Sequence, residues 1–515
     1  MQKAKKLIGL ALATCMAISM VAGCGSAEDK ASPSTATNSV VETSASTETE
    51  ALDPLDPVEL QWYVVGNGQP NDMDKVLAEV NKYLQSKINA TLKLNIFTWG
   101  DDFENKMSAK IQSGEKFDIT FTSNWACNYQ QNAPKGAFVD LTPLMDKYAP
   151  KTKELLGEKV IKGASINGKL YAIPTNKEMA HNWGFLVNKD MADKYGIDLS
   201  TIKKFEDIEP ALEIIKEKEG ANGVEAFQTL TGESAYRILD FEKLVDDNVP
   251  GALYGDGRDT KVINDFATPE AMSLFQTLNK WYKAGYIRKD ADTITDYAPA
   301  RKAGKVFATT ASLKPGKDAE QSISDGVNWT QIDITPPRAT TREMTGSMQA
   351  ISKTSPNPER ALMFLELMNN DAYLCNLVNY GIEGTHYTKV NDTTIEQTQA
   401  GKDNYNNSLQ WLFANQFNTY LFTTEDPQKW TKFKEYNASS AASPILGFTF
   451  NTENVKTQVA ALTAIKKQFM PGLETGKVDP VSIVPKFTAK LEAAGLKAVL
   501  DEMQKQVDEF VAANK

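Results

Sequence analysis

The chain has 515 residues, of which 41% are hydrophobic and 24% are charged, and its formal net charge at pH 7 is −10. An acidic chain lacks the concentrated basic surface that nucleic-acid binding requires, and its charge does not attract anionic lipid headgroups. At roughly 150 residues per domain, this length predicts a large body of two or three lobes that binds no nucleic acid.

The first 23 residues are typical of a secretory signal peptide. Three lysines precede an apolar run, residues 7–22, which is shorter than the roughly 20 apolar residues of a membrane-spanning helix. The run ends in residues 21–24 (VAGC), which resemble the bacterial lipobox. This resemblance implies that Cys24 becomes the new N-terminus and carries diacylglycerol, with acyl chains such as palmitate, which anchor the protein on the outer face of the cell membrane. An ordinary signal peptide with a chance cysteine is the alternative.

Residues 24–57 are predicted to form a disordered tether. Residues 25–50 contain eleven Ser or Thr residues and no aromatic residue. Such a segment cannot bury enough apolar surface to offset the entropy lost on ordering. Two Asp-Pro pairs, at residues 53–54 and 56–57, then mark an extended boundary before the folded part.

The folded part alternates between strand and helix patterns. In chain order, the patterns predict a strand over 58–65, a helix capped by Asn71 or Asp72, a strand over 92–96, a helix through Phe103, Met107 and Ile111, and a strand over 117–122. A further strand over 185–188 and helices over 191–195, 208–218 and 271–283 follow, and the pattern is mainly helical past residue 450. This order predicts two α/β lobes with mostly parallel sheets.

Polar and aromatic residues gather in loops that follow predicted strands, over residues 66–70, 123–129 and 174–183. Ligands of open α/β sheets bind beyond the carboxyl ends of the strands. A pyranose has apolar faces, which aromatic rings cover, and a rim of hydroxyls, which amides and carboxylates bind. We therefore predict a sugar site in a cleft between the lobes.

Nine residues are candidates for binding this ligand: Asn67, Trp125, Asn176, Glu178, Trp183, Tyr380, Glu383, His386 and Trp411. The tryptophans would stack on sugar rings, and packing in a loop or a core is the alternative for each of them. Glu178 would bind hydroxyls, or it is simply solvated, and Asn67 is equally well explained as a turn residue. The group around residues 380–386 would contact the ligand or latch the lobes, with a structural histidine as the alternative.

The sequence offers little support for catalysis. The two histidines, His181 and His386, lie far apart in the chain, and no HExxH, GxSxG, CxxC or Walker motif is present. Apart from Cys24 and a cysteine within the signal, only Cys127 and Cys375 remain, and we expect both to be buried free thiols, although one bridge is possible in this compartment. We predict no catalytic residue, no metal ion and no cofactor.

Several segments, in this order, resemble one known family. They are residues 136–144 (GAFVDLTPL), 168–174 (GKLYAIP), 187–190 (VNKD), 346–362 (GSMQAISKTSPNPERAL), 379–387 (NYGIEGTHY) and 443–448 (SPILGF). From about residue 58 to its end, the chain is similar to extracellular solute-binding proteins of family 1, the carbohydrate-binding lipoproteins of ABC importers. The last two segments are similar to the LipO-like branch, which has an extra helical region at the C-terminus.

The resemblance implies a type II periplasmic-binding-protein fold, in which two α/β lobes are joined by a hinge. We expect residues 58–172 and 340–390 to form lobe 1, and residues 173–339 and 391–515 to form lobe 2 with the C-terminal helices. The implied function is to capture a sugar or oligosaccharide by hinge closure and to deliver it unchanged to the permease subunits, with the protein acting as a monomer. The alternatives are a surface-anchored glycoside hydrolase and a lipid-tethered sensor or adhesin.

Overall fold

The computed structural model describes residues 55–229, 235–294, 296–406 and 409–514. The predicted signal peptide, Cys24 and the tether up to residue 54 lie outside these residues. Residues from Leu55 onward form one compact unit with two large hydrophobic cores, each built around its own sheet. We call the first sheet with its core lobe 1, and the second sheet with its core lobe 2. None of the described helices combines the length and apolar composition needed to cross a membrane.

The sheet of lobe 1 has the strand order β2-β1-β3-β12-β4. Its strands are β1 (Val58–Gly66), β2 (Ala90–Thr98), β3 (Ile119–Thr122), β4 (Ala172–Pro174) and β12 (Met348–Ile351). β1 pairs in parallel with β2 and β3, as the βαβ pattern predicts, whereas β12 runs antiparallel to both of its neighbours. Most of β1 is buried on both faces, which is typical of a central parallel strand.

Helices cover this sheet because each has one apolar face. They are α1 (Met73–Ile88), α2 (Asp101–Ser113), α5 (Pro150–Ala164), α12 (Pro358–Asn370) and α13 (Ala372–Tyr380). In α1, the buried residues Met73, Val76, Val80 and Leu84 recur every three or four positions. Asp72 is the N-cap residue of α1, but its side chain makes no capping hydrogen bond.

The sheet of lobe 2 has the order β10-β5-β9-β6 and is mainly antiparallel, which differs from the expected parallel arrangement. Its strands are β5 (Asn182–Asn188), β6 (Glu225–Gln228), β9 (Val306–Leu313) and β10 (Trp329–Asp333). Gly184 permits the close approach of β5 to β10, because a Cβ atom there would lie 2.0 Å from the carbonyl oxygen of Ile332. The predicted helices of this lobe appear as α6 (Lys189–Lys194), α7 (Glu209–Glu219) and α8 (Pro269–Ala284).

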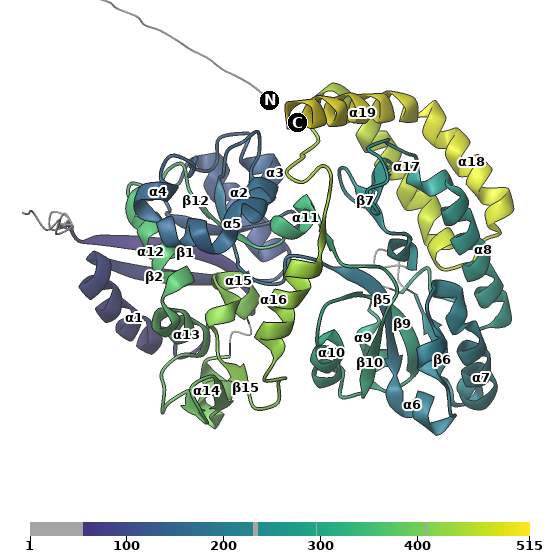
Figure 1. Cartoon of the computed structure of the whole chain (residues 1–515), viewed down its shortest axis with the longest axis horizontal. Helices are drawn as coiled ribbons and strands as arrows, with labels where there is room; N and C mark the ends of the chain where they lie inside the picture. Colours follow the sequence, from purple (N-terminus) through teal and green to yellow (C-terminus); the bar gives the residue numbers. More distant parts are fainter. Residues whose placement is uncertain (1–54, 230–234, 295, 407–408, 515) are drawn as a thin grey trace, which may run out of the picture. The chain divides into compact units, whose positions relative to one another are not determined.

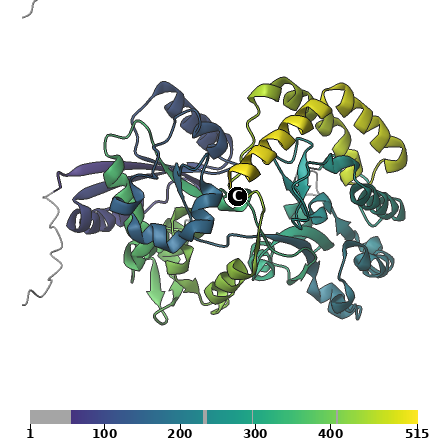
Figure 2. The same ribbon diagram turned by 45° about the horizontal axis from the view of Figure 1, so that its top comes forward.

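The C-terminal segment is helical, as predicted, and belongs to lobe 2. Its helices are α17 (Lys456–Glu474), α18 (Pro480–Ala493) and α19 (Leu496–Ala513). In Figures 1 and 2, these yellow helices lie beside the teal helix α8, and both α17 and α18 contact α8. The apolar stripe of α19, which includes Val499, Met503 and Val507, is buried in the core of lobe 2.

One lobe boundary differs from the expectation. We expected residues 391–515 in lobe 2, but Tyr405, Leu409, Leu412 and Phe413 pack into the core of lobe 1. The local sequence pattern shows that these side chains are apolar, but it does not show which core receives them. Three segments connect the two lobes: residues 175–181, 334–347 and 440–447.

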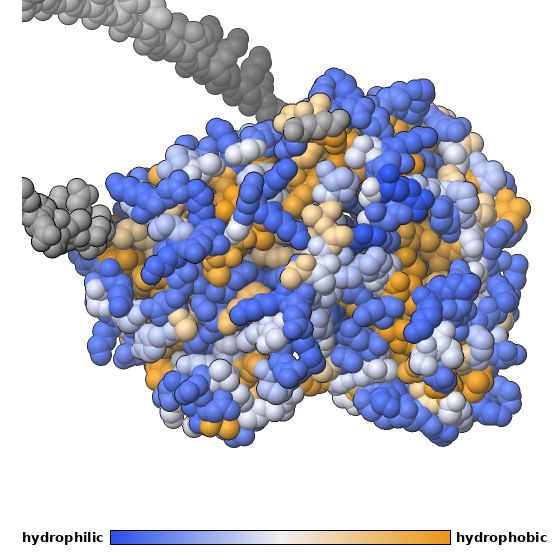
Figure 3. Space-filling model, viewed as in Figure 1, coloured by the Kyte–Doolittle hydropathy of each residue, from blue (hydrophilic) through white to orange (hydrophobic). Residues whose placement is uncertain are grey.

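The face drawn in Figure 3 is mostly hydrophilic, and hydrophobic residues show mainly in its recessed parts. The described cysteines, Cys127 and Cys375, are buried and unpaired, which confirms the prediction of free thiols.

Candidate functional site

Three tryptophans from separate parts of lobe 1 form a cluster. Trp99 follows β2, Trp125 follows β3, and Trp411 lies in the short helix α15 (Gln410–Phe413). The ring centroids lie 6.2 Å apart for Trp99 and Trp411, 6.3 Å for Trp99 and Trp125, and 6.2 Å for Trp125 and Trp411. Trp99 is 44% exposed and Trp125 is 49% exposed. An exposed cluster of large aromatic rings is a typical sign of a binding surface.

Hydrogen bonds hold two of these indoles in place. Trp99 Nε1 donates to Asn67 Oδ1 over 2.7 Å, and Trp125 Nε1 donates to the carbonyl oxygen of Gly346 over 2.8 Å. The polar atoms of the rings are therefore satisfied at their edges. Since a sugar stacks on the face of a ring, these bonds leave the stacking surface available.

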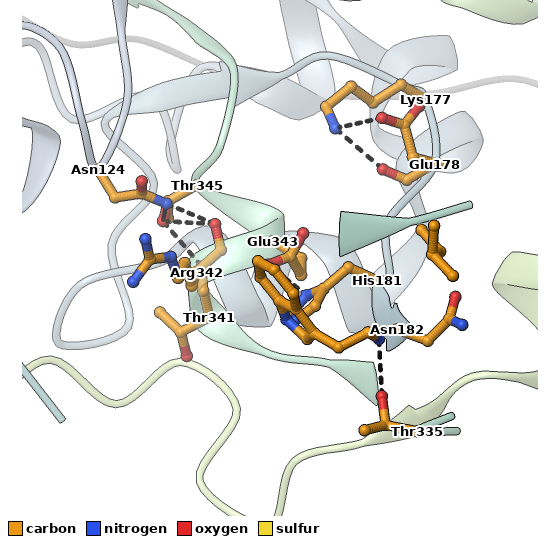
Figure 4. A network of polar contacts seen from close by, with 12 residues as sticks. Asn124, Lys177, Glu178, His181, Asn182, Thr335, Thr341, Arg342, Glu343 and Thr345 are labelled. Atoms are coloured by element: carbon orange, nitrogen blue, oxygen red, sulfur yellow. Dashed lines mark hydrogen bonds and ion pairs between the residues drawn. The ribbon is translucent and has the colours of Figure 1, made fainter. Parts of the chain in front are cut away.

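The Trp125 loop also contacts α11 (Thr341–Met344), a short helix between the two lobes. The backbone N–H of Asn124 donates to the carbonyl oxygen of Thr345, and the Asn124 side chain donates to the carbonyl oxygen of Arg342. On the lobe 2 side, Glu343 Oε1 lies 2.7 Å from His181 Nδ1. Figure 4 shows Asn124 bonded to the segment of Arg342 and Thr345, with Glu343 of the same segment beside His181.

A cavity of about 280 Å³ lies on the lobe 2 side of α11. Its lining includes His181, Trp183, Arg237, Asp247, Arg342 and Glu343. Trp183, at the start of β5, is only 8% exposed, and the guanidinium of Arg237 lies 5.1 Å from the centre of its ring. The cavity thus combines an aromatic wall with charged groups that can bond to hydroxyls.

The carboxylates of Glu343 and Asp247 stay ionised because cations lie beside them, whereas burial raises the pKa of Glu242, in the same lining, to about 7. Burial by itself would raise the pKa of Glu343, but His181, Lys177 and Arg342 lower it to about 2. Burial likewise opposes ionisation of Asp247, yet Arg342, Arg237 and Lys243 hold its pKa below the usual value. Charged acceptors in a partly dry site make strong hydrogen bonds to hydroxyl donors.

A second cavity, of about 330 Å³, shares His181, Trp183 and Glu343 with the first. Glu178 lines it from the segment between the lobes, and its Oε1 lies 3.1 Å from Lys177 Nζ and 3.3 Å from Lys314 Nζ. Burial opposes ionisation of Glu178, but the two lysines lower its pKa to about 2. Glu178 Oε2 is buried and makes no hydrogen bond to the residues that the structure describes, so it could accept one from a ligand hydroxyl that reaches it.

The structure brings only part of the predicted set together. Asn67, Trp125 and Trp411 belong to the tryptophan cluster, and Trp183 and Glu178 line the cavities. Asn176 lies in the segment between the lobes, where its Nδ2 donates to Asn415 Oδ1.

The group around residue 380 lies apart from both cavities, since none of its members is among their lining residues. The Tyr380 hydroxyl donates to the carbonyl oxygen of Tyr420, and Glu383 forms an ion pair with Lys389. His386 is fully buried, accepts a hydrogen bond from the backbone N–H of Ile382 at Nδ1, and lies 3.2 Å from Asp72 Oδ2 at Nε2. These contacts match the structural alternative for His386.

Sequence reasoning missed Trp99, Arg237, Asp247 and Arg342. Trp99 had a detectable signal, because it follows directly on the carboxyl end of a strand. The charged residues had no such signal in the sequence, since charged side chains are common on any protein surface. Among the residues that the structure describes, no group of three His, Cys, Asp or Glu side chains is placed to hold a metal ion.

Comparisons with known proteins match almost the whole folded part. A family model described as bacterial extracellular solute-binding protein matches residues 70–373, and a domain of unknown function (DUF3502) matches residues 444–512. A carbohydrate ABC transporter substrate-binding protein of Streptococcus pneumoniae serotype 4 is 33% identical over 473 residues, which cover 90% of this chain and 94% of the relative. Lipoprotein LipO of Bacillus subtilis is 25% identical, over 72% of each chain.

Solved structures of a relative are similar to this chain over most of its length. The relative is the N-glycan transport solute binding protein NgtS from Streptococcus pneumoniae, with a TM-score of 0.81, 32% identity, and coverage of 89% of this chain and 100% of that chain. Complexes of NgtS with Man1GlcNAc and Man5GlcNAc give TM-scores of 0.71 and 0.69, at 31% and 32% identity, over 88% and 89% of this chain and the whole of theirs.

Proposed function

We propose that this chain, which belongs to the bacterial extracellular solute-binding proteins, captures an oligosaccharide outside the cell and delivers it unchanged to the permease of an ABC importer. The match to the family model and the likeness to NgtS confirm the predicted family and its two-lobe fold with C-terminal helices. The sugar specificity, the anchor and the partner subunits are the parts that we propose.

One observation carries the proposal: an exposed tryptophan cluster is joined through α11 to a charged cavity beside Trp183. The cluster provides apolar faces for sugar rings, and the cavity provides acceptors and donors for hydroxyls. Aromatic surfaces at both ends of α11 suit a ligand of several rings better than a monosaccharide.

Hinge closure is supported by the relatives. The chain is more similar to the NgtS structure described without a ligand than to either sugar complex, with TM-scores of 0.81 against 0.71 and 0.69. This difference is what a rearrangement of the lobes on binding would produce. Closure would exclude water from the charged groups and so strengthen their bonds to the sugar.

We infer that the protein does not cleave its ligand. The inference rests on the relatives reported above, which are described as binding proteins. The electrostatics of the cavity do not carry it, because burial raises the pKa of Glu242 to about 7, whereas cations lower the pKa values of Glu343 and Asp247. A glycoside hydrolase needs one carboxylic acid that is protonated at working pH. Chromatography of sugar recovered after long incubation tests this point, and a shortened product would reveal a hydrolase.

The anchor is proposed from the lipobox-like residues 21–24 and from the likeness to a lipoprotein. Labelled palmitate should be incorporated into the wild-type protein in cells and not into a Cys24→Ala variant. Release of the wild-type protein into the medium, without label, would contradict the anchor. We further propose that the anchored monomer docks on the permease subunits.

Titration with neutral oligosaccharides, followed by tryptophan fluorescence and calorimetry, tests the function itself. We expect a dissociation constant of about 1 μM or tighter for the best probe of a panel that includes Man5GlcNAc, which corresponds to about 8 kcal/mol. Absence of binding across neutral and acidic oligosaccharides would contradict the proposal.

A further inference from the structure

The cations that line the first cavity are all engaged by carboxylates. Arg237 and Arg342 both pair with Asp247. Lys243 pairs with Asp265, Lys466 pairs with Glu474, and His181 lies beside Glu343. Asp240 and Glu242 add further acids to the lining. The cavity therefore has abundant charge but no excess of cations to offer an anionic ligand.

Asp247 holds the two arginines nearest the aromatic wall. Its Oδ2 lies 2.6 Å from Arg237 Nη2 and 3.2 Å from Arg342 Nη2, and its Oδ1 accepts from Arg342 Nη1 over 3.4 Å. The same Arg237 covers the ring of Trp183. A carboxylate carried by a sugar stacked near Trp183 would seek these same two guanidinium groups, because arginine binds carboxylates through paired N–H donors.

The two arginines come from different parts of the fold. Arg237 lies in the turn η4 (Ala235–Leu239) of lobe 2, and Arg342 lies in α11, whose carbonyl groups hold the Trp125 loop. Asp247 thus occupies the point where lobe 2 meets the helix that supports the tryptophan cluster.

We propose that Asp247 is a specificity-determining residue, which occupies both guanidinium groups and so makes the site select neutral oligosaccharides over uronate-containing ones. This inference rests on the proposed function and names its substrate class. A uronate entering the site would have to displace Asp247 or remain beside it as a like charge. A neutral sugar has no such penalty, because its hydroxyls can donate to Asp247 and accept from the arginines at the same time.

The test uses a matched pair of probes: tetragalacturonate and its fully methyl-esterified form, which differ in charge but share one sugar backbone. Binding to the purified full chain is measured by calorimetry at low and moderate salt. For the wild-type protein, we expect the ester to bind at least as tightly as the acid. For Asp247→Asn, we expect affinity for tetragalacturonate to rise by about tenfold or more relative to the ester, with a new dependence on salt, because Arg237 and Arg342 lose their ion pairs with Asp247.

Two further variants make the result specific. Asp247→Asn combined with Arg342→Gln removes one of the released cations and should reduce the gain. Asp256→Asn removes a comparable ion pair, that with Arg258, from outside the cavity and should leave the ratio of the two probes unchanged. Thermal unfolding confirms that each variant is folded, and Asp247→Ser serves as a second substitution if the asparagine variant is not.

Tighter binding of tetragalacturonate than of its ester by the wild-type protein would overturn the inference. So would a folded Asp247 variant that gains no affinity for the acid. These outcomes are distinct from failure of the proposed function, since the latter requires that the wild-type protein bind no oligosaccharide, neutral or acidic.

Discussion

The indole rings of Trp99 and Trp411 lie 6.2 Å apart and are inclined by only 18°, although one follows strand β2 and the other lies in helix α15. With Trp125 they form the aromatic surface on which the proposed sugar site depends. The two rings can meet because Leu409, Leu412 and Phe413, which flank Trp411, pack into the core of lobe 1.

Removing a ring from this cluster should weaken sugar binding and leave the fold intact. Trp99→Ala or Trp125→Ala loses a stacking face worth about 1–2 kcal/mol, which corresponds to roughly a fivefold to thirtyfold rise in dissociation constant. Calorimetry with the best oligosaccharide of the panel measures the effect. Tyr373→Ala is the matched control, since Tyr373 is exposed but lines neither cavity. Unchanged affinity in both tryptophan variants would place the site elsewhere.

The ionised carboxylate of Glu343, whose pKa is lowered by His181, Lys177 and Arg342, should stabilise the protein at neutral pH and lose its effect in acid. Folding lowers the pKa of Glu343 from its ordinary value of 4.5 to about 2. The stabilisation is therefore present above about pH 4.5 and is lost as the pH falls toward 2. We expect Glu343→Gln to lower the free energy of unfolding by on the order of 2–3 kcal/mol at pH 7 and by much less near pH 3. Urea denaturation at both pH values measures this.

Glu217→Gln is the control for that measurement, because Glu217 pairs with Lys218 on the surface, where an ion pair contributes little. If the Glu343→Gln variant were as stable as the wild type at pH 7, the Glu343 carboxylate would not stabilise the fold.

The thiols of Cys127 and Cys375 should be unreactive in the native protein. Burial raises the pKa of each thiol to about 12, mainly because the thiolate is poorly solvated there. A thiol reagent at pH 8 should label neither residue until denaturant is added. Cys127→Ala and Cys375→Ala should each remove one of the thiols that unfolding exposes, and rapid labelling of the native chain at either position would contradict the buried environment.

Strand β5 should tolerate no side chain at residue 184. A Cβ atom there would lie 2.0 Å from the carbonyl oxygen of Ile332, so Gly184→Ala must push β10 away and should destabilise the protein by about 3 kcal/mol. Thermal and chemical unfolding measure the loss. Gly220→Ala is the control, because its nearest neighbours are atoms of the flexible Lys216 side chain and its backbone is helical. Equal stability of the two variants would show that the β5–β10 contact can relax.

Local patterns determined much of the fold from sequence. The spacing of Met73, Val76, Val80 and Leu84 predicted α1, and the alternation around Leu92 and Leu94 predicted β2, because one face of each element must be buried. The resemblance of the segments to one family identified the two-lobe architecture, which the comparisons confirm.

The sequence by itself placed Trp125 in a loop after a predicted strand and Trp183 in a loop before another, whereas the structure shows that Trp183 already belongs to β5. Only the tertiary structure placed Trp99 and Trp411 beside Trp125, showed that residues 409–414 pack with lobe 1, and placed Arg342 next to Asp247. It also separated His386 from the site. The physical reason is that hydrophobic periodicity tells which face of an element is buried, whereas contacts between distant segments depend on how whole elements pack, which no local pattern records.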